Sequence, residues 1–224
     1  MNRLTKIANK CGTDKGTEHG VANGYTEIYE RYFSKFEKPV IVEIGILNGD
    51  SIRMLNDYFD GDCKIFACDI DETCREKVKD IENVTFVHVD VSNSDSISGL
   101  AKILDDAGGA DIIIDDASHV WSHIMKTLAA LYKYVKPNGI YIVEDIHLGM
   151  VKDWKDCFNE GHTNEESPAN YFLLPQKTSL LTEEENQQLR EHIESSMIFS
   201  HKNVRQDSLK CGDGRCITAI ITFN

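Results

Sequence analysis

The chain has 224 residues, of which 41% are hydrophobic and 27% charged, and its net charge is −13 at pH 7. This length and balance are typical of one globular domain and exclude a disordered chain. The acidic charge argues against a nucleic-acid partner, because proteins that bind nucleic acids usually carry a basic surface. No apolar run reaches the roughly 20 residues of a membrane span or resembles a signal peptide. We therefore expect a cytoplasmic protein with reduced thiols.

Short apolar runs alternate with segments of helical spacing along the middle of the chain. Helical spacing predicts helices over 50–59, 71–81, 97–108 and 123–139, the last of which stops at Pro137. The apolar runs predict strands over 39–45, 63–70, 84–91, 111–115 and 140–145. Repeated β–α–β units of this kind form a doubly wound, mostly parallel sheet with helices on both faces, a Rossmann-like α/β fold.

The two ends of the chain differ from this core. Thr182 followed by Glu185 is a capping box and predicts a helix start. Two further apolar runs, 197–201 and 216–223, predict an antiparallel hairpin at the sheet edge, and the loop CGDGRC (211–216) is read as a tight turn rather than a zinc site, because two more ligands are missing. We treat residues 1–224 as one domain, divided into an amino-terminal cap (1–37), a core (38–149), a substrate-side insertion (150–195) and the terminal hairpin (196–224).

The turn after the first strand, EIGILNGDS, has the features of a nucleotide site. Gly45 allows backbone to approach a ligand, and Asp69 follows Gly49 by about 20 residues, the interval of a carboxylate that accepts from a ribose hydroxyl. Both NAD and S-adenosylmethionine fit this pattern. A carboxylate at Glu43 favours S-adenosylmethionine, because it attracts a sulfonium and repels a pyrophosphate, and the dinucleotide motif G-x-G-x-x-G is missing. The candidate cofactor-binding residues here are Glu43, Gly45, Gly49, Ser51, Asp69 and Asp90.

Three carboxylates mark the ends of the fourth and fifth strands. Neighbouring strands lie roughly 4.8 Å apart, so Asp116 is expected beside Glu144 and Asp145. Such carboxylates repel one another unless they share a cation. Oxygen ligands suit Mg²⁺, with Mn²⁺ or Ca²⁺ as alternatives.

A histidine follows the first of these carboxylates. His119 comes three residues after Asp116, on the same face if a helical turn begins there. An imidazole is mostly neutral at neutral pH and can remove a proton from an acceptor hydroxyl. His123 and His147 are rivals for this role, but His123 is expected to point elsewhere.

Four segments together resemble the metal-dependent sugar O-methyltransferases: GTDKGTEHGVANGYTEIYE (12–30), VEIGILNGDSIRML (42–55), DIIIDDASHVWSH (111–123) and YIVEDIH (141–147). The resemblance implies a class I methyltransferase fold, Mg²⁺ held by Asp116, Glu144 and Asp145, and His119 as general base. It also implies that Lys15 and Tyr25 line the cofactor pocket, with Lys15 near the methionine carboxylate. Ala117 departs from the family, which often has glycine there.

The expected activity is methylation of a sugar hydroxyl, on a nucleotide-linked sugar, a glycoside or a polymer end, with S-adenosylmethionine and Mg²⁺ as cofactors. The expected partner is thus a small-molecule sugar, without nucleic acid or membrane, and a homo-oligomer is expected. The alternatives are a catechol-type O-methyltransferase, an NAD-dependent oxidoreductase, and a binding module that retains the fold without turnover.

Overall fold

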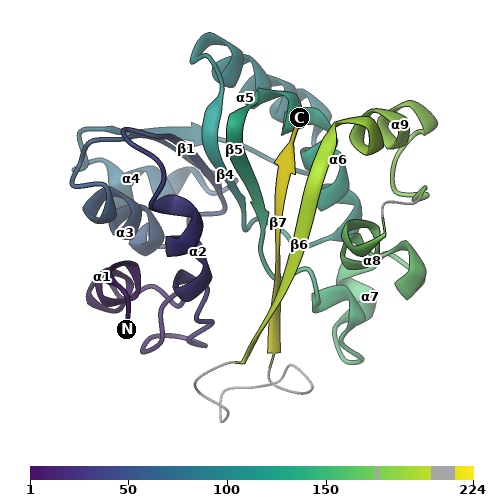
Figure 1. The fold of residues 1–224 in the computed structure, drawn as a ribbon, viewed down its shortest axis with the longest axis horizontal. Helices are drawn as coiled ribbons and strands as arrows, with labels where there is room; N and C mark the ends of the chain where they lie inside the picture. Colours follow the sequence, from purple (N-terminus) through teal and green to yellow (C-terminus); the bar gives the residue numbers. More distant parts are fainter. Residues whose placement is uncertain (175–176, 203–214) are drawn as a thin grey trace.

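A single mixed sheet forms the centre of the molecule (Figure 1). The computed structural model describes residues 1–174, 177–202 and 215–224, and the strands among these residues have the order β3-β2-β1-β4-β5-β7-β6. The first five strands pair in parallel, and β7 pairs antiparallel with both β5 and β6. Their bounds are Val40–Ile44 (β1), Lys64–Asp69 (β2), Val84–His88 (β3), Ala110–Asp115 (β4), Val135–Val143 (β5), Ile193–Lys202 (β6) and Arg215–Phe223 (β7).

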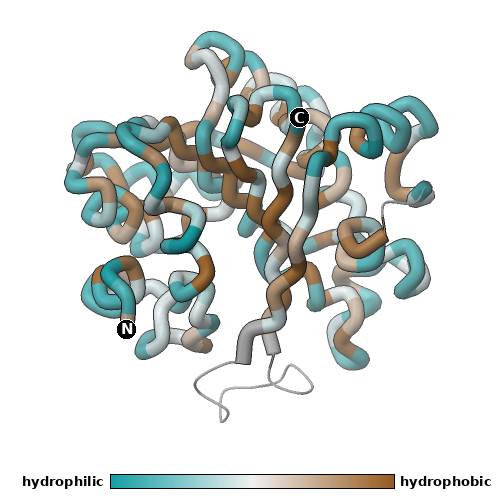
Figure 2. The backbone as a smooth tube through the Cα atoms, viewed as in Figure 1, coloured by the Kyte–Doolittle hydropathy of each residue, from teal (hydrophilic) through white to brown (hydrophobic). Residues whose placement is uncertain are grey.

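Helices cover both faces of the sheet, and each face has its own hydrophobic core. The first core lies under α5, α6, α8 and α9, and the second lies under α1, α2 and α3. Figure 2 shows that the central strands are hydrophobic and the outer helical surfaces are hydrophilic. The helices are Arg3–Cys11 (α1), Thr26–Phe33 (α2), Asp50–Tyr58 (α3), Arg75–Val78 (α4), Ser94–Asp106 (α5), Trp121–Leu131 (α6), Lys155–Phe158 (α7), Pro168–Leu173 (α8) and Glu183–His192 (α9), with 3-10 turns at Glu72–Cys74 (η1), Tyr132–Tyr134 (η2), Leu148–Met150 (η3) and Asn164–Glu166 (η4).

The predicted fold class is confirmed, including the antiparallel strands at the sheet edge, but several boundaries differ. The helix predicted over 123–139 ends at Leu131, and β5 already begins at Val135. A register shift in the pairing of β4 with β5 explains how Pro137 can lie within β5. Residues 136–139 are left without partners on β4, so the missing N–H of proline breaks no ladder hydrogen bond.

Three other boundaries also differ. The helix predicted over 97–108 begins at Ser94, because Asn93 caps it with its side chain. The segment 71–81 forms η1 and the short α4 instead of one helix. The outer strand of the hairpin begins at Ile193 rather than at 197. The loop read as a tight turn lies almost wholly outside the described residues.

The carboxyl end of β4 contains a buried acid that makes no ion pair among the described residues. Asp115 is 4% exposed and accepts hydrogen bonds from the Tyr141 hydroxyl at 3.3 Å and the Ala117 amide at 3.4 Å. Burial raises the pKa of Asp115 to about 7, because an apolar environment disfavours the charged form.

This shift predicts how stability depends on pH. A free aspartate titrates near pH 4, whereas Asp115 titrates at about 7 in the folded protein. The native state therefore binds the Asp115 proton more tightly than the unfolded state does, which stabilises the fold. This contribution to the free energy of unfolding is fully present below about pH 4 and is lost as pH rises through about 7. Asp115→Asn cannot ionise, so this variant should not show the fall in stability with rising pH. We expect chemical denaturation to show the variant gaining a few kcal/mol relative to wild type between pH 5 and pH 8, at about 1.4 kcal/mol per pKa unit.

Asp111→Asn is the matched control, because Asp111 lies at the other end of β4, partly exposed and paired with Lys136. Parallel pH profiles for wild type and Asp115→Asn would contradict the assignment.

Candidate functional site

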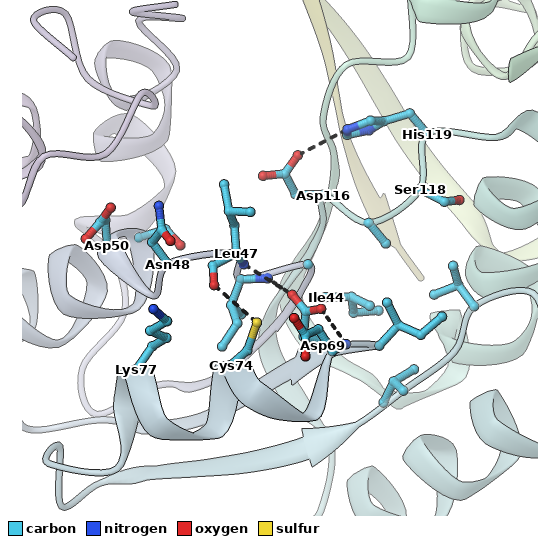
Figure 3. A pocket seen from close by; sticks show the side chains of 18 of the residues that line it. Ile44, Leu47, Asn48, Asp50, Asp69, Cys74, Lys77, Asp116, Ser118 and His119 are labelled. Carbon is cyan, nitrogen blue, oxygen red and sulfur yellow. Dashed lines mark hydrogen bonds and ion pairs between the residues drawn. The ribbon is translucent and has the colours of Figure 1, made fainter. Parts of the chain in front are cut away.

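A cavity of about 990 Å³ opens at the carboxyl ends of β1–β4. In doubly wound sheets this edge is where ligands bind. In Figure 3, Asp116 and His119 border it on one side, and Leu47, Asp69 and Cys74 lie on the other. Seven aspartates and two lysines line the cavity. Its charge therefore favours a cationic ligand.

The glycine turn after β1 holds two strand ends together. Gly45 has φ +90°, and a Cβ there would lie 2.2 Å from the carbonyl oxygen of Asp116, so only glycine fits. Gly49 has φ +76° and precedes α3, whose first turn contains the buried Ser51. The Gly45 backbone thus approaches the turn after β4 at close range, and both turns line the cavity.

The two predicted cofactor carboxylates, one at the end of β2 and one shortly after β3, both line the cavity. Asp69 Oδ2 accepts from the amides of Ile46 at 2.9 Å and Leu47 at 3.1 Å, so it shapes the glycine turn. Asp90 accepts from the Ser92 hydroxyl and amide, which lower its pKa. A carboxylate has about four acceptor positions, so both acids can still accept from a ligand.

Two exposed apolar side chains at the cavity were missed by the sequence analysis. Leu47 is 76% exposed and has φ +47°, and Ile70 is 62% exposed. Both line the cavity. Ile70 directly follows Asp69 in sequence, which was the available signal, whereas Leu47 lies beside Asp69 only in space, through its amide at 3.1 Å; an exposed apolar pair next to a carboxylate suits a nucleoside.

A buried lysine joins three strand ends. Lys15 is 2% exposed, and its Nζ lies 2.5 Å from Asp116 Oδ2, 2.7 Å from Glu144 Oε2 and 3.6 Å from Glu43 Oε1. These acids come from β1 and from the turns after β4 and β5, which are neighbours in the sheet. Burial alone would lower the pKa of Lys15, but the three carboxylates outweigh it and raise the pKa well above its usual value. Lys15 is therefore an ammonium ion here.

The two glutamates of this cluster are fully enclosed. Glu43 is 0% exposed, and neither of its oxygens has a hydrogen-bond partner among the described residues. Burial raises the pKa of Glu43 to about 7. Glu144 accepts from the Tyr29 hydroxyl at 2.6 Å as well as from Lys15, and burial, followed by the charge of Asp116, raises its pKa well above the ordinary value. Glu43 was expected to face a cationic cofactor, but the cation beside it in the structure is Lys15.

The predicted base and two of the predicted metal ligands come together. Ligand atoms of Asp116, His119 and Asp145 all lie within 4.8 Å of one another, with His119 Nε2 3.9 Å from Asp116 Oδ1. The third predicted ligand, Glu144, turns toward Lys15 and Tyr29 instead. The oxygen donors fit a hard divalent cation, and the Glu43 oxygens behind them, with Lys15 Nζ at 3.6 Å from Oε1, have no hydrogen-bond partner of ordinary geometry among the described residues.

The backbone explains how His119 reaches Asp116. The expected helical turn at 116–119 is absent, since α6 begins only at Trp121. Instead, His119 has φ +57°, and Asp145 has φ +52°. Left-handed conformations at non-glycine residues cost of order 1 kcal/mol and cluster at functional sites.

The remaining predicted residues occupy other positions. Tyr25 is buried and donates a hydrogen bond to Asp145, so it supports the acid rather than lining the cavity. His123 does line the cavity, contrary to expectation, because it lies in the first turn of α6; its Nδ1 is 2.8 Å from the Ser118 hydroxyl.

His147 is buried, and its Nδ1 accepts from the Ile217 amide at 3.3 Å. With Asp145 and Cys216 it forms a second group of potential metal ligands.

No protein-family model matches the chain, and no helix in its described part is long and apolar enough to cross a membrane. Among curated proteins, the 8-demethyl-8-alpha-L-rhamnosyl tetracenomycin-C 2'-O-methyltransferase of Streptomyces olivaceus is 30% identical over 166 residues, covering 70% of this chain and 41% of that protein. The mycinamicin VI 2''-O-methyltransferase of Micromonospora griseorubida is 26% identical over 152 residues, covering 64% of this chain and 36% of that protein.

Among solved structures, the MycE methyltransferase of the mycinamycin biosynthetic pathway, in complex with Mg and SAH, superposes with a TM-score of 0.72 at 20% identity, covering 100% of this chain and 55% of that one. This chain thus spans well under half the length of the two curated relatives. It has the fold of the class I methyltransferases, and the two curated relatives named above are O-methyltransferases that act on sugar-bearing natural products by their names.

Proposed function

We propose that this chain transfers a methyl group from S-adenosylmethionine to a sugar hydroxyl in a reaction that depends on Mg²⁺. The observation that carries the proposal is an acidic cavity at the sheet edge whose lining includes the cluster of Asp116, His119 and Asp145. The names of the curated relatives and the Mg and SAH in the MycE structure support the same reading.

The cavity suits S-adenosylmethionine better than NAD. The cofactor supplies a methyl group on a positively charged sulfur, together with an ammonium group, and a site with seven aspartates attracts both charges. A pyrophosphate would meet Asp50 in the first turn of α3, where a phosphate site would offer bare N–H groups. Asp69 would accept from the ribose, and Leu47 and Ile70 would contact the adenine.

Asp116 and Asp145 would hold the divalent cation, and Glu144 would join them once Lys15 no longer occupies its oxygen. A Mg²⁺ ion bound there supplies Lewis acidity that makes a sugar hydroxyl easier to ionise. His119 would accept the hydroxyl proton at Nε2 while the oxygen is aligned with the methyl carbon. The positive φ of His119 holds the imidazole at this position.

An aromatic pair borders the proposed base and bears on the acceptor. The Phe158 ring lies 6.3 Å from the His119 ring, and the Trp154 ring lies 6.2 Å from Phe158. Such a surface can stack on the apolar face of a sugar or on an aromatic ring. A catechol-type diol is therefore the second candidate acceptor.

The proposal is tested by offering nucleotide-linked sugars, glycosides and catechols together with methyl-labelled S-adenosylmethionine. We expect one sugar acceptor to gain the mass of one labelled methyl group. EDTA should abolish this product, and Mg²⁺ should restore it, because a bound cation would make the hydroxyl easier to ionise. Product formation that EDTA does not change would refute the metal assignment, and exclusive methylation of catechols would select the second candidate.

Substitution of His119 should separate catalysis from binding. We expect His119→Ala to lower kcat by about 10²–10⁴-fold, the usual contribution of a general base, while the affinity for S-adenosylhomocysteine stays within a factor of three or so. His123→Ala is the matched control, since His123 lines the same cavity but pairs with Ser118. It should retain most turnover. Equal turnover of His119→Ala and wild type would remove His119 from this role.

Substitution of Asp69 should weaken cofactor binding. Asp69→Ala removes a charged acceptor worth about 1.5–3 kcal/mol, so calorimetric titration with S-adenosylhomocysteine should show roughly ten- to hundredfold weaker binding. Asp80→Ala, which removes an exposed partner of Arg53 outside the cavity, should bind as wild type does. If both variants bind equally well, Asp69 only shapes the turn.

A further inference from the structure

We infer that Lys15 is an internal cation that fills the carboxylate cluster when no divalent ion is bound, and that Lys15 and the divalent ion exclude each other. This inference rests on the metal dependence proposed above and concerns how the same site is regulated. Its basis is the convergence of Asp116, Glu144 and Glu43 on a single ammonium group.

The position of the ammonium is a cation position by its contacts. Lys15 Nζ lies at 2.5 Å from Asp116 Oδ2 and at 2.7 Å from Glu144 Oε2, so the two oxygens face each other across one small space. A divalent ion that binds both of them must enter that space, because its bonds to oxygen are short, about 2.0–2.6 Å. The ammonium and the ion cannot both fit there.

Electrostatics gives the same result. The cluster contains three carboxylates and one ammonium, all shielded from solvent except for part of Asp116. With Lys15 in place the cluster is partly neutralised, and the ammonium repels a second cation a few ångströms away, so the carboxylates attract a divalent ion less strongly. Without Lys15, three carboxylates face one another, and a divalent ion is the natural counter-charge.

The side chain can leave while its backbone stays. The carbonyl oxygen of Lys15 accepts from the Thr26 amide at 3.2 Å, and the neighbouring Gly16 carbonyl accepts from Gly24 at 2.8 Å. These bonds hold the segment between α1 and α2 in place, whereas a lysine side chain rotates about four bonds. Residues 12–15 also line the cofactor cavity, so departure of the ammonium would change the wall of that cavity and would couple metal binding to cofactor binding.

The test measures Mn²⁺ binding by the electron paramagnetic resonance signal of the free ion, on wild type, Lys15→Met and Lys136→Met. Lys136 pairs with Asp111 at 2.9 Å at the opposite end of β4 and is the matched control. We expect Lys15→Met to bind Mn²⁺ at least tenfold more tightly than wild type, and Lys136→Met to bind as wild type does. In EDTA, Lys15→Met should melt below wild type, and Mn²⁺ should raise its melting temperature by the larger amount.

Mn²⁺ binding by Lys15→Met that is equal to or weaker than that of wild type would overturn the inference and leave the proposed function intact. Absence of Mn²⁺ binding in all three proteins would overturn both the inference and the metal part of the proposal. Titration with S-adenosylhomocysteine on the same samples then shows whether the cofactor part stands.

A measurement on wild type keeps the inference testable if Lys15→Met does not fold. Acetylation by an N-hydroxysuccinimide ester requires an accessible amine, and Lys15 is buried in its ion pairs. Peptide mass spectrometry should show acetylation of Lys15 increasing at least severalfold with Mn²⁺, relative to the exposed Lys35. An unchanged ratio in a sample that binds Mn²⁺ would overturn the exchange.

Discussion

The structure depends on one electrostatic constraint: three acids from adjacent strand ends are enclosed around a single ammonium group. Buried carboxylates without a counter-charge are costly, and these strand ends cannot move apart because they belong to one parallel sheet. Lys15 is 129 residues from Glu144 in sequence, yet it supplies the charge. The amino-terminal segment is thus fastened to the sheet by its charge as well as by the hydrophobic core under α1 and α2.

The same constraint explains why the site and the fold cannot be separated. Gly45 lets the turn after β1 touch the backbone of Asp116, and Asp69 holds that turn through two amides. These contacts position the cavity wall and also bring the acids within range of Lys15. A substitution at this edge would therefore change stability and ligand binding together, which is why each proposed assignment needs a control residue outside the cluster.

Much of the fold could be predicted because buried parallel strands are continuous apolar runs, and because the acids at their ends must share one edge. Other features have no local signal. Nothing near Lys15 in sequence shows that it reaches Glu144, and the left-handed backbone of His119 follows from packing rather than from residue type. The start of β5 was missed because unpaired residues around Pro137 look like a helix end. Sequence periodicity gives no information on long-range charge pairing or on backbone strain.

The segment after β5 is attached to the site separately from the acids at the strand ends. Glu160 Oε2 accepts from the Ser122 amide at 3.1 Å, at the first turn of α6, where a carboxylate is favoured by the free N–H groups and the helix dipole. That contact ties α7 and its aromatic residue Phe158 to the turn that carries His119. The acids of the strand ends are fixed by sheet topology, whereas this wall lies outside the sheet and is attached by contacts such as that of Glu160. Under the proposed function, acceptor choice can therefore change by substitutions in this segment while the cofactor and metal residues stay in place.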